Sequence, residues 1–542
     1  MKNNQPSLFS FLFLAVLLSG IFYFMMPQSY DVTEAPLSEF STKRALEIVK
    51  NMSAKPHFVG SQNHKAVANY LQKELQSLGL QTTVQEGFTM TEKGTLVKAK
   101  NIITKIKGTT DSKALLLLAH YDSAPHSFSH GASDDASGVA TIIESVRAFL
   151  HNKSTNKNDI IILFSDAEEV GLNGAALFVT QHLWAKNIGL VLNFEARGSS
   201  GPSYMLMETN QGNSKMSEAF KAANATYPVS NSLMYSVYKM LPNDTDLTVF
   251  REAGKIQGFN FAFIDSHYDY HTAQDKFDHL DPKTLAHQGS YLFPLLNHLA
   301  NADLSDLASA EDDIYFTVPF GFISYPFAWI FPMLIVGFAL LFLFVFIGLG
   351  KQVLRIDEII KGFLPLFGAL ITAGLVTYIG WKLLLNFYPE YQDILQGFTY
   401  NGQDYCYAFT SLTLGICFLF YQNKGKRHPE MNQLIAPLFI WLLINTGIAL
   451  KLKGAGFMIL PVLSSAFMLG FYVLTQKTNW LLNVILAIPT LLILAPLIQM
   501  FPVGLGLKVM FGTSILTVLT FALLLPIFGS YEKKGIWATL FI

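Results

Sequence analysis

Residues 114–138 read ALLLLAHYDSAPHSFSHGASDDASG. The run 114–119 is short and apolar, which is typical of a strand that is buried on both faces of a sheet. It is followed by His120, by a turn-rich segment and, from Gly138 to Leu150, by apolar residues at helical spacing. A buried strand that leads into a helix predicts one unit of a parallel α/β sheet.

Three other short apolar runs predict further strands of this sheet, at residues 159–164, 190–194 and 259–264. Helices are predicted at residues 42–52 and 61–78, because each run opens near a serine or threonine and then carries apolar residues three and four positions apart. Short strands that alternate with helices are typical of the α/β class. We therefore expect a mostly parallel, mixed sheet that is flanked by helices.

The hydrophobic residues of the chain are unevenly distributed. They make up 51% of 542 residues, yet residues 30–310 have an ordinary globular composition, whereas residues 320–530 contain repeated apolar runs of membrane-spanning length. An uncharged run from Leu8 to Met26 is also long enough to cross a bilayer, and it ends in FYFMMP, a poor site for cleavage of a signal peptide. We predict a signal-anchor helix (1–27), a globular domain (28–310) and a multi-pass membrane domain (320–542).

The membrane domain is predicted to be α-helical, with about seven spans at residues 323–350, 362–384, 405–421, 433–450, 455–475, 480–500 and 506–529. Basic residues cluster at 351–361, 424–427 and 533–534, with Lys451 and Lys453 as the exception. Since cytoplasmic loops are enriched in lysine and arginine, this pattern predicts a cytoplasmic N-terminus and a globular domain on the periplasmic, extracellular or lumenal side. Residues 535–542 have the composition of a further span, as in a chain that is truncated at its C-terminus.

Charge and cysteine content exclude several kinds of partner and site. The net charge is -1 and no basic stripe is present, so we expect no nucleic-acid partner. The apolar half predicts the lipid bilayer as a partner. Cys406 and Cys417 both lie in that half, and the globular domain therefore has neither a disulfide nor a thiolate metal site.

Acidic and histidine residues follow the predicted strands. Seven of them share a place at the carboxyl end of a strand or at the start of the helix after it: His120, Asp122, Asp134, Glu168, Glu169, Glu195 and His271. Singly, such residues are usually structural or solvated. Ligands of open α/β sheets bind outside the carboxyl ends of the strands, so the occurrence of all seven there predicts one common site.

Histidines and carboxylates without cysteine are ligands that suit zinc, with manganese or cobalt as alternatives. The number of candidates predicts two ions, with Asp134 as the carboxylate that bridges both. His120 and Glu195 complete the site of one ion, and Glu169 and His271 complete the site of the other. Three carboxylates against two divalent ions leave a net positive charge, which favours a bridging hydroxide at neutral pH.

Two carboxylates remain for catalysis. Glu168 is not needed as a ligand, although it adjoins the ligand Glu169, and it is predicted to be the general base. Asp122 lies two residues beyond His120 and is predicted to orient its imidazole through the nitrogen that faces away from the metal.

The motifs HYDS (120–123), GASDDASG (131–138), EEVGL (168–172) and YHT (270–272) resemble those of the metallopeptidase family of bacterial double-zinc aminopeptidases and aminopeptidase Y. The multi-pass layout is similar to the branch of that family with vacuolar membrane protease and endoplasmic-reticulum metallopeptidase. This resemblance implies a membrane-bound zinc exopeptidase that hydrolyses peptides or proteins, and the expected type is an aminopeptidase. It also implies the metal, base and orienting roles given above.

The resemblance carries one backbone expectation and two departures. It implies a cis peptide bond between Asp134 and Asp135. Glu195 stands where soluble aminopeptidases usually have aspartate, and the longer side chain is expected to change the hold on one metal. Asp246-Leu247 stands where many relatives have an Asp-His pair that lines the substrate site. The resemblance therefore does not imply a substrate preference for this chain.

Three other functions remain as alternatives: a glutaminyl cyclase-like enzyme with a single zinc, a non-catalytic receptor-like ectodomain, and transport by the membrane half. The complete ligand set opposes the first two. The scarcity of charged residues within the predicted spans opposes the third. The sequence leaves open whether the enzyme trims N-termini, trims C-termini or cuts internally.

Overall fold

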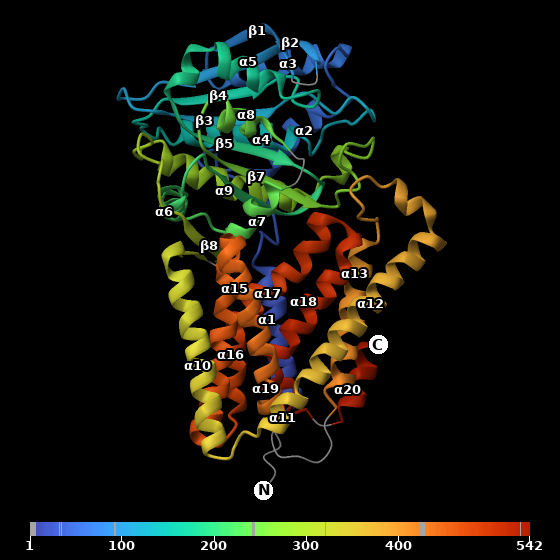
Figure 1. The fold of residues 1–542 in the computed structure, drawn as a ribbon. Helices are drawn as coiled ribbons and strands as arrows, with labels where there is room; N and C mark the ends of the chain where they lie inside the picture. The colour runs from blue at the N-terminus through green and yellow to red at the C-terminus, as the bar shows by residue number, and fades with distance from the viewer. Residues whose placement is uncertain are drawn as a thin grey trace. The chain divides into compact units, whose positions relative to one another are not determined.

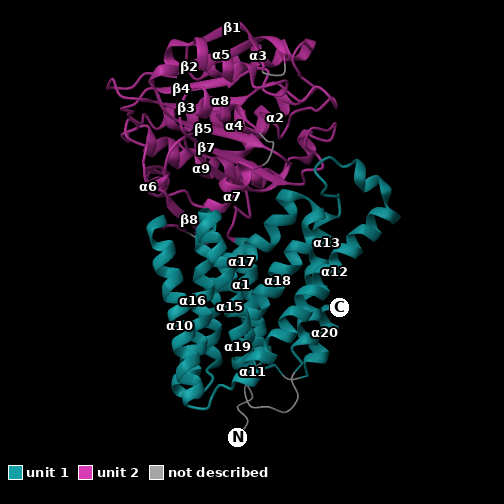
Figure 2. Ribbon diagram, in the orientation of Figure 1, with its two compact units in different colours: residues 1–23, 327–542 teal, residues 24–326 magenta. Residues whose placement is uncertain are grey.

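The computed structural model describes residues 7–31, 33, 35–91, 94–240, 244–319, 321–422, 429–531 and 533–542. The chain forms two compact units (Figure 2), one of residues Phe24–Pro326 and the other of the N-terminal helix α1 (Ser7–Tyr23) with the chain from Phe327 onward. Each unit has its own architecture.

A mixed sheet forms the centre of the unit Phe24–Pro326 (Figure 1). Its strands are β1 (Thr82–Met90), β2 (Leu96–Ile106), β3 (Ala114–His120), β4 (Ile160–Ser165), β5 (Ile188–Ala196), β6 (Ser200–Glu208) and β7 (Gly258–Asp265). They lie in the order β1-β2-β4-β3-β5-β7-β6. The pairs β3–β4, β3–β5 and β5–β7 are parallel, whereas the pairs β1–β2, β2–β4 and β6–β7 are antiparallel.

Helices cover both faces of this sheet. They are α2 (Thr42–Met52), α3 (Gln62–Ser77), α4 (Ala136–His151), α5 (Asn173–Gln181), α6 (Ser214–Ala223), α7 (Ser232–Tyr238), α8 (Asp246–Glu252) and α9 (Pro282–Leu299). Leu115 and Leu117 of β3 pack in a core with α4 and α9, while Leu116 and Leu118 pack in a second core with α5 and α8. Successive residues of a strand point to opposite faces, so the continuous apolar run of β3 is explained by burial on both sides.

The predicted α/β fold with a mixed sheet between helices is confirmed. The four predicted strands are β3, β4, β5 and β7, which are the central strands of the sheet. The predicted helices at 42–52 and 61–78 are α2 and α3, and the side chains of Ser41 and Ser61 cap them by accepting the backbone N–H groups of Arg44 and His64. The strands β1, β2 and β6 were not predicted, nor was the hairpin of β8 (Asp313–Val318) and β9 (Gly321–Pro326).

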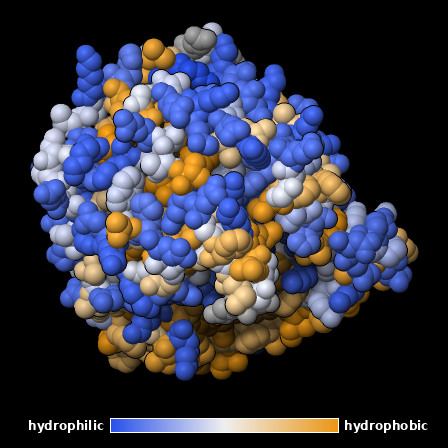
Figure 3. Space-filling view, turned by 90° about the horizontal axis from the view of Figure 1, so that it is seen from above, coloured by the Kyte–Doolittle hydropathy of each residue, from blue (hydrophilic) through white to orange (hydrophobic). Residues whose placement is uncertain are grey.

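The face seen in Figure 3 is mostly hydrophilic, with small apolar patches between the polar residues. Among the exposed apolar side chains of the unit Phe24–Pro326 are Phe88 and Met90 of the edge strand β1. Scattered exposed apolar residues of this kind are ordinary on a water-exposed surface.

The second unit consists of apolar helices. They are α10 (Ile330–Gly350), α11 (Ile356–Lys361), α12 (Phe363–Phe387), α13 (Gly402–Phe420), α14 (Pro429–Gln433), α15 (Ile435–Lys451), α16 (Ile459–Thr475), α17 (Trp480–Leu505), α18 (Met510–Leu523), α19 (Leu525–Phe528) and α20 (Lys534–Phe541). Within this unit, α1 packs against α17 and α10 packs against α16.

Among the described residues, 5 helical segments are long and apolar enough to cross a membrane: Phe327–Gly350, Ile356–Phe387, Glu430–Lys451, Lys453–Thr475 and Trp480–Leu505. Shorter apolar helices lie at Leu8–Tyr23 and Leu507–Leu523. The span predicted at 405–421 corresponds to α13, which is not one of these segments and carries Asp404 in its first turn. The span predicted from residue 323 begins later, because β9 occupies Gly321–Pro326. The basic cluster 424–427 lies outside the described residues.

Candidate metal centre

The carboxyl ends of the central strands bring the predicted ligands together. His120 is the last residue of β3, and Glu195 is the next-to-last residue of β5. Glu169 and His271 lie in the segments that follow β4 and β7, and Asp134 lies just before helix α4. Because β3, β4, β5 and β7 run in parallel, these ends meet at one edge of the sheet.

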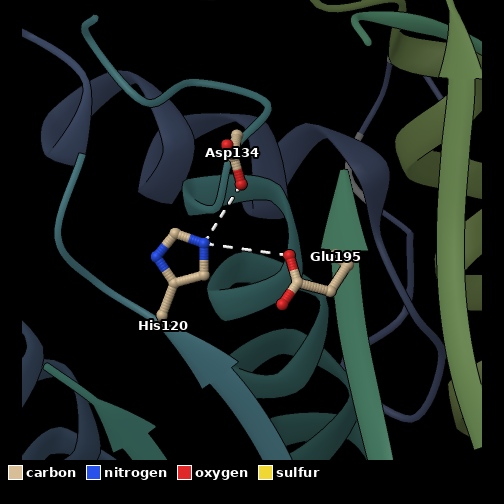
Figure 4. Close-up of side chains that lie close together, drawn as sticks. All are labelled: His120, Asp134 and Glu195. Atoms are coloured by element: carbon tan, nitrogen blue, oxygen red, sulfur yellow. Dashed lines mark hydrogen bonds and ion pairs between the residues drawn. The ribbon is translucent and has the colours of Figure 1, made fainter. Parts of the chain in front are cut away.

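The first group of candidate ligands is deeply buried (Figure 4). The Nε2 atom of His120 lies 3.0 Å from Oδ1 of Asp134 and 3.8 Å from Oε2 of Glu195. The side chains of these three residues are only 1%, 4% and 7% exposed, respectively. One imidazole nitrogen and two carboxylate oxygens therefore converge on a single point at which a cation can be held.

The second group shares Asp134 with the first. Nε2 of His271 lies 3.1 Å from Oδ2 of Asp134 and 2.9 Å from Oε2 of Glu169. The two carboxylate oxygens of Asp134 thus face two different histidines, which is the arrangement expected of a bridging ligand. The His271 side chain is 35% exposed, whereas that of His120 is 1% exposed, so solvent reaches the second group more easily.

Backbone hydrogen bonds fix the loop that presents Asp134. The backbone N–H of Ser133 donates to Oδ1 of Asp275 at 2.7 Å, and the N–H of Asp134 donates to Oδ2 at 3.2 Å. Asp275 itself is buried, and burial together with the charge of Asp134 raises its pKa to about 7. The Asp134–Asp135 peptide bond is cis, as the resemblance implied.

Asp135 joins this loop to helix α4 and to β3. Its Oδ1 accepts the backbone N–H of Gly138 at 3.0 Å, and its Oδ2 accepts the backbone N–H of His120 at 3.3 Å. A Cβ atom on Gly138 would lie 2.5 Å from Oδ1 of Asp135. Glycine is therefore required at position 138 so that the Asp135 carboxylate can cap the helix closely.

Asp122 contacts both a histidine and the adjacent glutamates. Nδ1 of His120 lies 3.0 Å from the backbone carbonyl oxygen of Asp122 and 3.6 Å from its Oδ1. The carbonyl, rather than the carboxylate named by the prediction, is thus the nearer partner of the imidazole. The carboxylate of Asp122 instead accepts the backbone N–H groups of Glu168 at 3.0 Å and Glu169 at 3.3 Å. Asp122 therefore supports both groups of ligands.

The carboxyl groups of the site are short of compensating positive charge. Burial raises the pKa of Glu195 to about 8, and burial together with the charge of Asp134 raises the pKa of Glu169 to about 8. Burial lowers the pKa of His271, but hydrogen bonds to Asp134 and Glu169 outweigh this effect and raise it to about 10. Burial also raises the pKa of Glu168 well above its usual value. Divalent cations would supply the missing charge.

The donor set fits two zinc ions. Each group offers one imidazole nitrogen and two carboxylate oxygens within 4.8 Å of one another. Within the described part of the chain, Oε1 of Glu169 is buried without a hydrogen-bond partner. A buried oxygen of this kind costs about 1–3 kcal/mol unless something pairs with it. Nitrogen and oxygen donors in a buried, carboxylate-rich site are what a divalent metal requires.

Two neighbours of the site were not given a role by the sequence. Tyr270 stacks on His271 with 3.7 Å between ring centroids, and burial, with the charges of Asp134 and Glu169, raises its pKa well above the usual value. Asp246 of α8 is buried and accepts a hydrogen bond from the Ser165 hydroxyl. Burial raises the pKa of Asp246 to about 6. Tyr270 belongs to the YHT motif and Asp246 stands where many relatives have an Asp-His pair, but neither observation specifies a contact with the ligands.

Residues 101–296 match the model of peptidase family M28. The vacuolar membrane protease of Candida dubliniensis is 28% identical over 487 residues, which cover 82% of this chain and 50% of that protein. The endoplasmic reticulum metallopeptidase 1 of Homo sapiens is 32% identical over 212 residues, which cover 39% of this chain and 23% of that protein. The chain thus spans half or less of the length of these relatives.

Solved structures with a similar fold include a Zn-dependent exopeptidase from Parabacteroides distasonis, with 21% sequence identity and a TM-score of 0.39. The matched region covers 48% of this chain and 98% of that one. A glutaminyl cyclase from Bacteroides thetaiotaomicron has 24% identity and a TM-score of 0.38, and it covers 48% of this chain and 98% of its own length.

Proposed function

We propose that this chain, whose residues 101–296 match the model of peptidase family M28, is a membrane-bound, zinc-dependent exopeptidase of the aminopeptidase type. The observation that carries the proposal is the Asp134 carboxylate, whose two oxygens face His120 and His271 in two separate ligand groups. A carboxylate shared in this way supports a two-metal hydrolytic site. The substrate is then a peptide or a protein.

In this proposal, the residues that hold two zinc ions are His120, Asp134, Glu169, Glu195 and His271. When bound, the ions would supply Lewis acidity, which polarises the scissile carbonyl and lowers the pKa of the attacking water, so that it can lose a proton at neutral pH. Glu168 accepts the proton of the attacking water and donates it to the leaving amine. A carboxyl group whose pKa is raised by burial, as that of Glu168 is, suits both steps. Asp122 holds Glu168 and Glu169 in place through their backbone N–H groups.

Two substitutions at adjacent residues test the roles. Glu168→Gln keeps the shape of the side chain but removes the proton acceptor, so turnover should fall by about 10²–10⁴ while zinc content stays at two ions per chain. Glu169→Gln weakens a ligand, so it should lower zinc content first, with activity partly restored by excess zinc. Glu86→Gln, on the exposed edge strand β1, is the matched control and should change neither quantity.

Zinc content and peptide turnover, measured on the same purified full-length variants, test the roles of the two glutamates. Equal zinc loss in the two site variants, or normal turnover in Glu168→Gln, would contradict the assignment. A wild-type chain that binds one zinc and cyclises N-terminal glutamine would favour the glutaminyl cyclase-like alternative. Free, N-blocked and C-blocked peptides would distinguish an aminopeptidase, which requires a free N-terminus, from the other peptidase types.

We also propose that the N-terminus is cytoplasmic and that the zinc-binding unit lies on the opposite side of the membrane. The support is the three clusters of basic residues between and after the apolar helices, at 351–361, 424–427 and 533–534. The basic residues of these clusters that lie in the described part of the chain are Lys351, Arg355, Lys361, Lys533 and Lys534. Lysine and arginine are retained on the cytoplasmic side. The relatives named above are proteins of the vacuolar membrane and the endoplasmic reticulum.

A further inference from the structure

A buried chain of hydrogen bonds begins at the candidate ligand Glu195 and crosses three strands. The amide Nδ2 of Asn193 donates to Oε1 of Glu195 at 3.4 Å and to Oδ1 of Asn260 at 3.2 Å. Nδ2 of Asn260 donates to Oε1 of Glu208 at 3.5 Å, and Nε of Arg251 donates to Oε2 of Glu208 at 3.1 Å. We call Asn193, Asn260, Glu208 and Arg251 the polar chain.

The polar chain occupies positions where a sheet interior normally holds apolar side chains. Asn193, Asn260 and Glu208 lie on β5, β7 and β6 and are 0%, 1% and 0% exposed. Asn193 and Asn260 are direct partners in the register of β5 and β7, so their amides meet across the two strands. Arg251, on α8, supplies the positive charge that a buried Glu208 needs.

Stability alone does not account for these residues. A buried amide or carboxylate contributes little net stability when it is paired, and it destabilises the fold when one partner is lost. Apolar residues of similar volume would serve the core equally well or better. The polar chain is therefore expected to have a role other than stability, and the candidate ligand Glu195 lies at its inner end.

We propose that the polar chain positions Glu195, so that Asn193 holds its Oε1 while its Oε2 alone faces the first metal site. This inference rests on the proposed function, because it assumes that Glu195 is a zinc ligand. The geometry agrees with it: the oxygen that is not bound by Asn193 is the one that lies 3.8 Å from Nε2 of His120. Glu208 and Arg251 in turn hold Asn260, and Asn260 fixes the amide of Asn193. These four are positioning residues, since none of them touches the metal.

The test measures the affinity of each zinc ion separately, in the full-length protein, by titration against competing chelators. Binding of the two ions gives two steps in this titration. Asn193→Ala should lower the zinc affinity of the step that belongs to the first site by about 10–100-fold, which is the usual effect of removing a group that orients a ligand. The step that belongs to the second site, with Glu169 and His271, should stay unchanged. His120→Ala identifies the first-site step, because His120 contributes only to that group.

Two further variants keep the test independent of folding defects. Glu208→Gln preserves the shape of the side chain and its contact with Asn260 but removes the charge, and it should weaken the same step by a smaller factor. Asn158→Ala is the matched control: Asn158 is a buried asparagine whose amide donates to the carbonyl oxygens of Leu299 and Ala302, away from the site. It should lower thermal stability without changing either zinc step.

The possible results separate the two proposals. If the wild-type protein binds two zinc ions and Asn193→Ala leaves both steps unchanged, or weakens both equally, the positioning role is wrong and the proposed function stands. If the wild-type protein binds fewer than two ions, both proposals are wrong. Selective loss of the first-site step in Asn193→Ala and Glu208→Gln, with Asn158→Ala unaffected, supports the inference.

Discussion

Substitution of Asp122 by asparagine tests how the site is held together. The Asp122 side chain is fully buried, and its two carboxylate oxygens accept the backbone N–H groups of Glu168 and Glu169. In Asp122→Asn, one oxygen remains to accept one of these N–H groups, while the new amide N–H₂ points at the other. One hydrogen bond is lost, two donors face each other, and the bond that survives no longer has a charged acceptor.

The size of the effect follows from these contacts. A hydrogen bond to a charged group contributes about 1.5–3 kcal/mol, and a neutral one contributes about 0.5–1.5 kcal/mol. Loss of one bond and weakening of the other should therefore lower the free energy of unfolding by about 2–4 kcal/mol. For a unit of this size, Tm should fall by about 2 °C per kcal/mol, or about 4–8 °C in total. Because the loop carries both the proposed base and a proposed ligand, turnover and second-site zinc affinity should each fall by about 10–100-fold.

Thermal unfolding, zinc titration and peptide turnover of the full-length variant measure these effects. Asp281→Asn is the matched control, because the Asp281 carboxylate also accepts a backbone N–H, that of Lys283, at the start of α9. The control should lose only about 0.3–1 kcal/mol, the effect of removing a negative charge from a helix N-terminus, because asparagine caps a helix about as well as aspartate, and zinc affinity and turnover should be unchanged. If Asp122→Asn has normal zinc affinity and turnover, Asp122 does not hold the two glutamates and the reasoning fails.

Two other predictions concern pH and topology. In the metal-free protein, the pKa values of Glu169 and Glu195 are raised to about 8 and that of His271 to about 10. The fold therefore keeps protons that the unfolded chain has already lost, and the stability that this provides is lost as pH rises, from about 4.5 to 8 for the two glutamates and from about 6.5 to 10 for His271. Zinc requires the deprotonated groups, so the Tm difference between zinc-loaded and metal-free protein should widen from pH 5 to pH 8, and a constant difference would contradict the prediction. In intact cells, Thr155→Cys should react with an impermeant maleimide while Lys361→Cys reacts only after permeabilisation; the reverse pattern would refute the orientation.

The central strands could be predicted because both of their faces are buried. A run such as that of β3 is apolar at every position, and few other structures give this pattern in so few residues. The edge strand β1 alternates between partly buried and exposed residues and contains Gly87, so it resembles a loop in the sequence. The strand β6 starts with Ser200-Gly201-Pro202, which is typical of a turn. These strands form because β2 and β7 offer free edges, and that is a tertiary effect.

The membrane half shows a similar limit. The helix α17 contains Pro489, Pro496 and Pro502 and nevertheless continues from Trp480 to Leu505. Proline is tolerated in apolar helices when neighbouring helices and local adjustments satisfy the freed carbonyl groups. By contrast, the apolar run predicted as one span at 506–529 is divided into η6 (Leu507–Val509), α18 and α19. Hydropathy gives the apolar segments but not the points at which each helix breaks.

The five candidate ligands could be placed at one edge of the sheet from the sequence, because four of them follow strands whose direction was itself predictable. The structure brings them together in two groups that share Asp134. No role was predicted for Asp275 or for the polar chain, because hydrogen bonds to backbone groups and between amides have no fixed spacing along the sequence. A usable signal was nevertheless present: Asn193 and Asn260 are asparagines within strands that are otherwise apolar. A buried polar residue of this kind has to be paired.

The glutamate at position 195 is a longer ligand than usual, and the two asparagines are expected to compensate partly for its length. Glutamate has one more rotatable bond than the aspartate usual in the soluble aminopeptidases that this chain resembles, and fixing a glutamate side chain costs up to about 1.5–2 kcal/mol in lost rotamer freedom. A longer ligand that is free to rotate would bind its metal less tightly. The hydrogen bond from Asn193 to Oε1 of Glu195 restricts that freedom before any metal arrives. Because burial keeps the metal-free carboxyl group largely protonated at neutral pH, this bond contributes about 0.5–1.5 kcal/mol, which offsets part of the cost. On this reasoning the longer ligand loosens the first metal site less than a freely rotating glutamate would, because Asn193 and, behind it, Asn260 order it within the sheet.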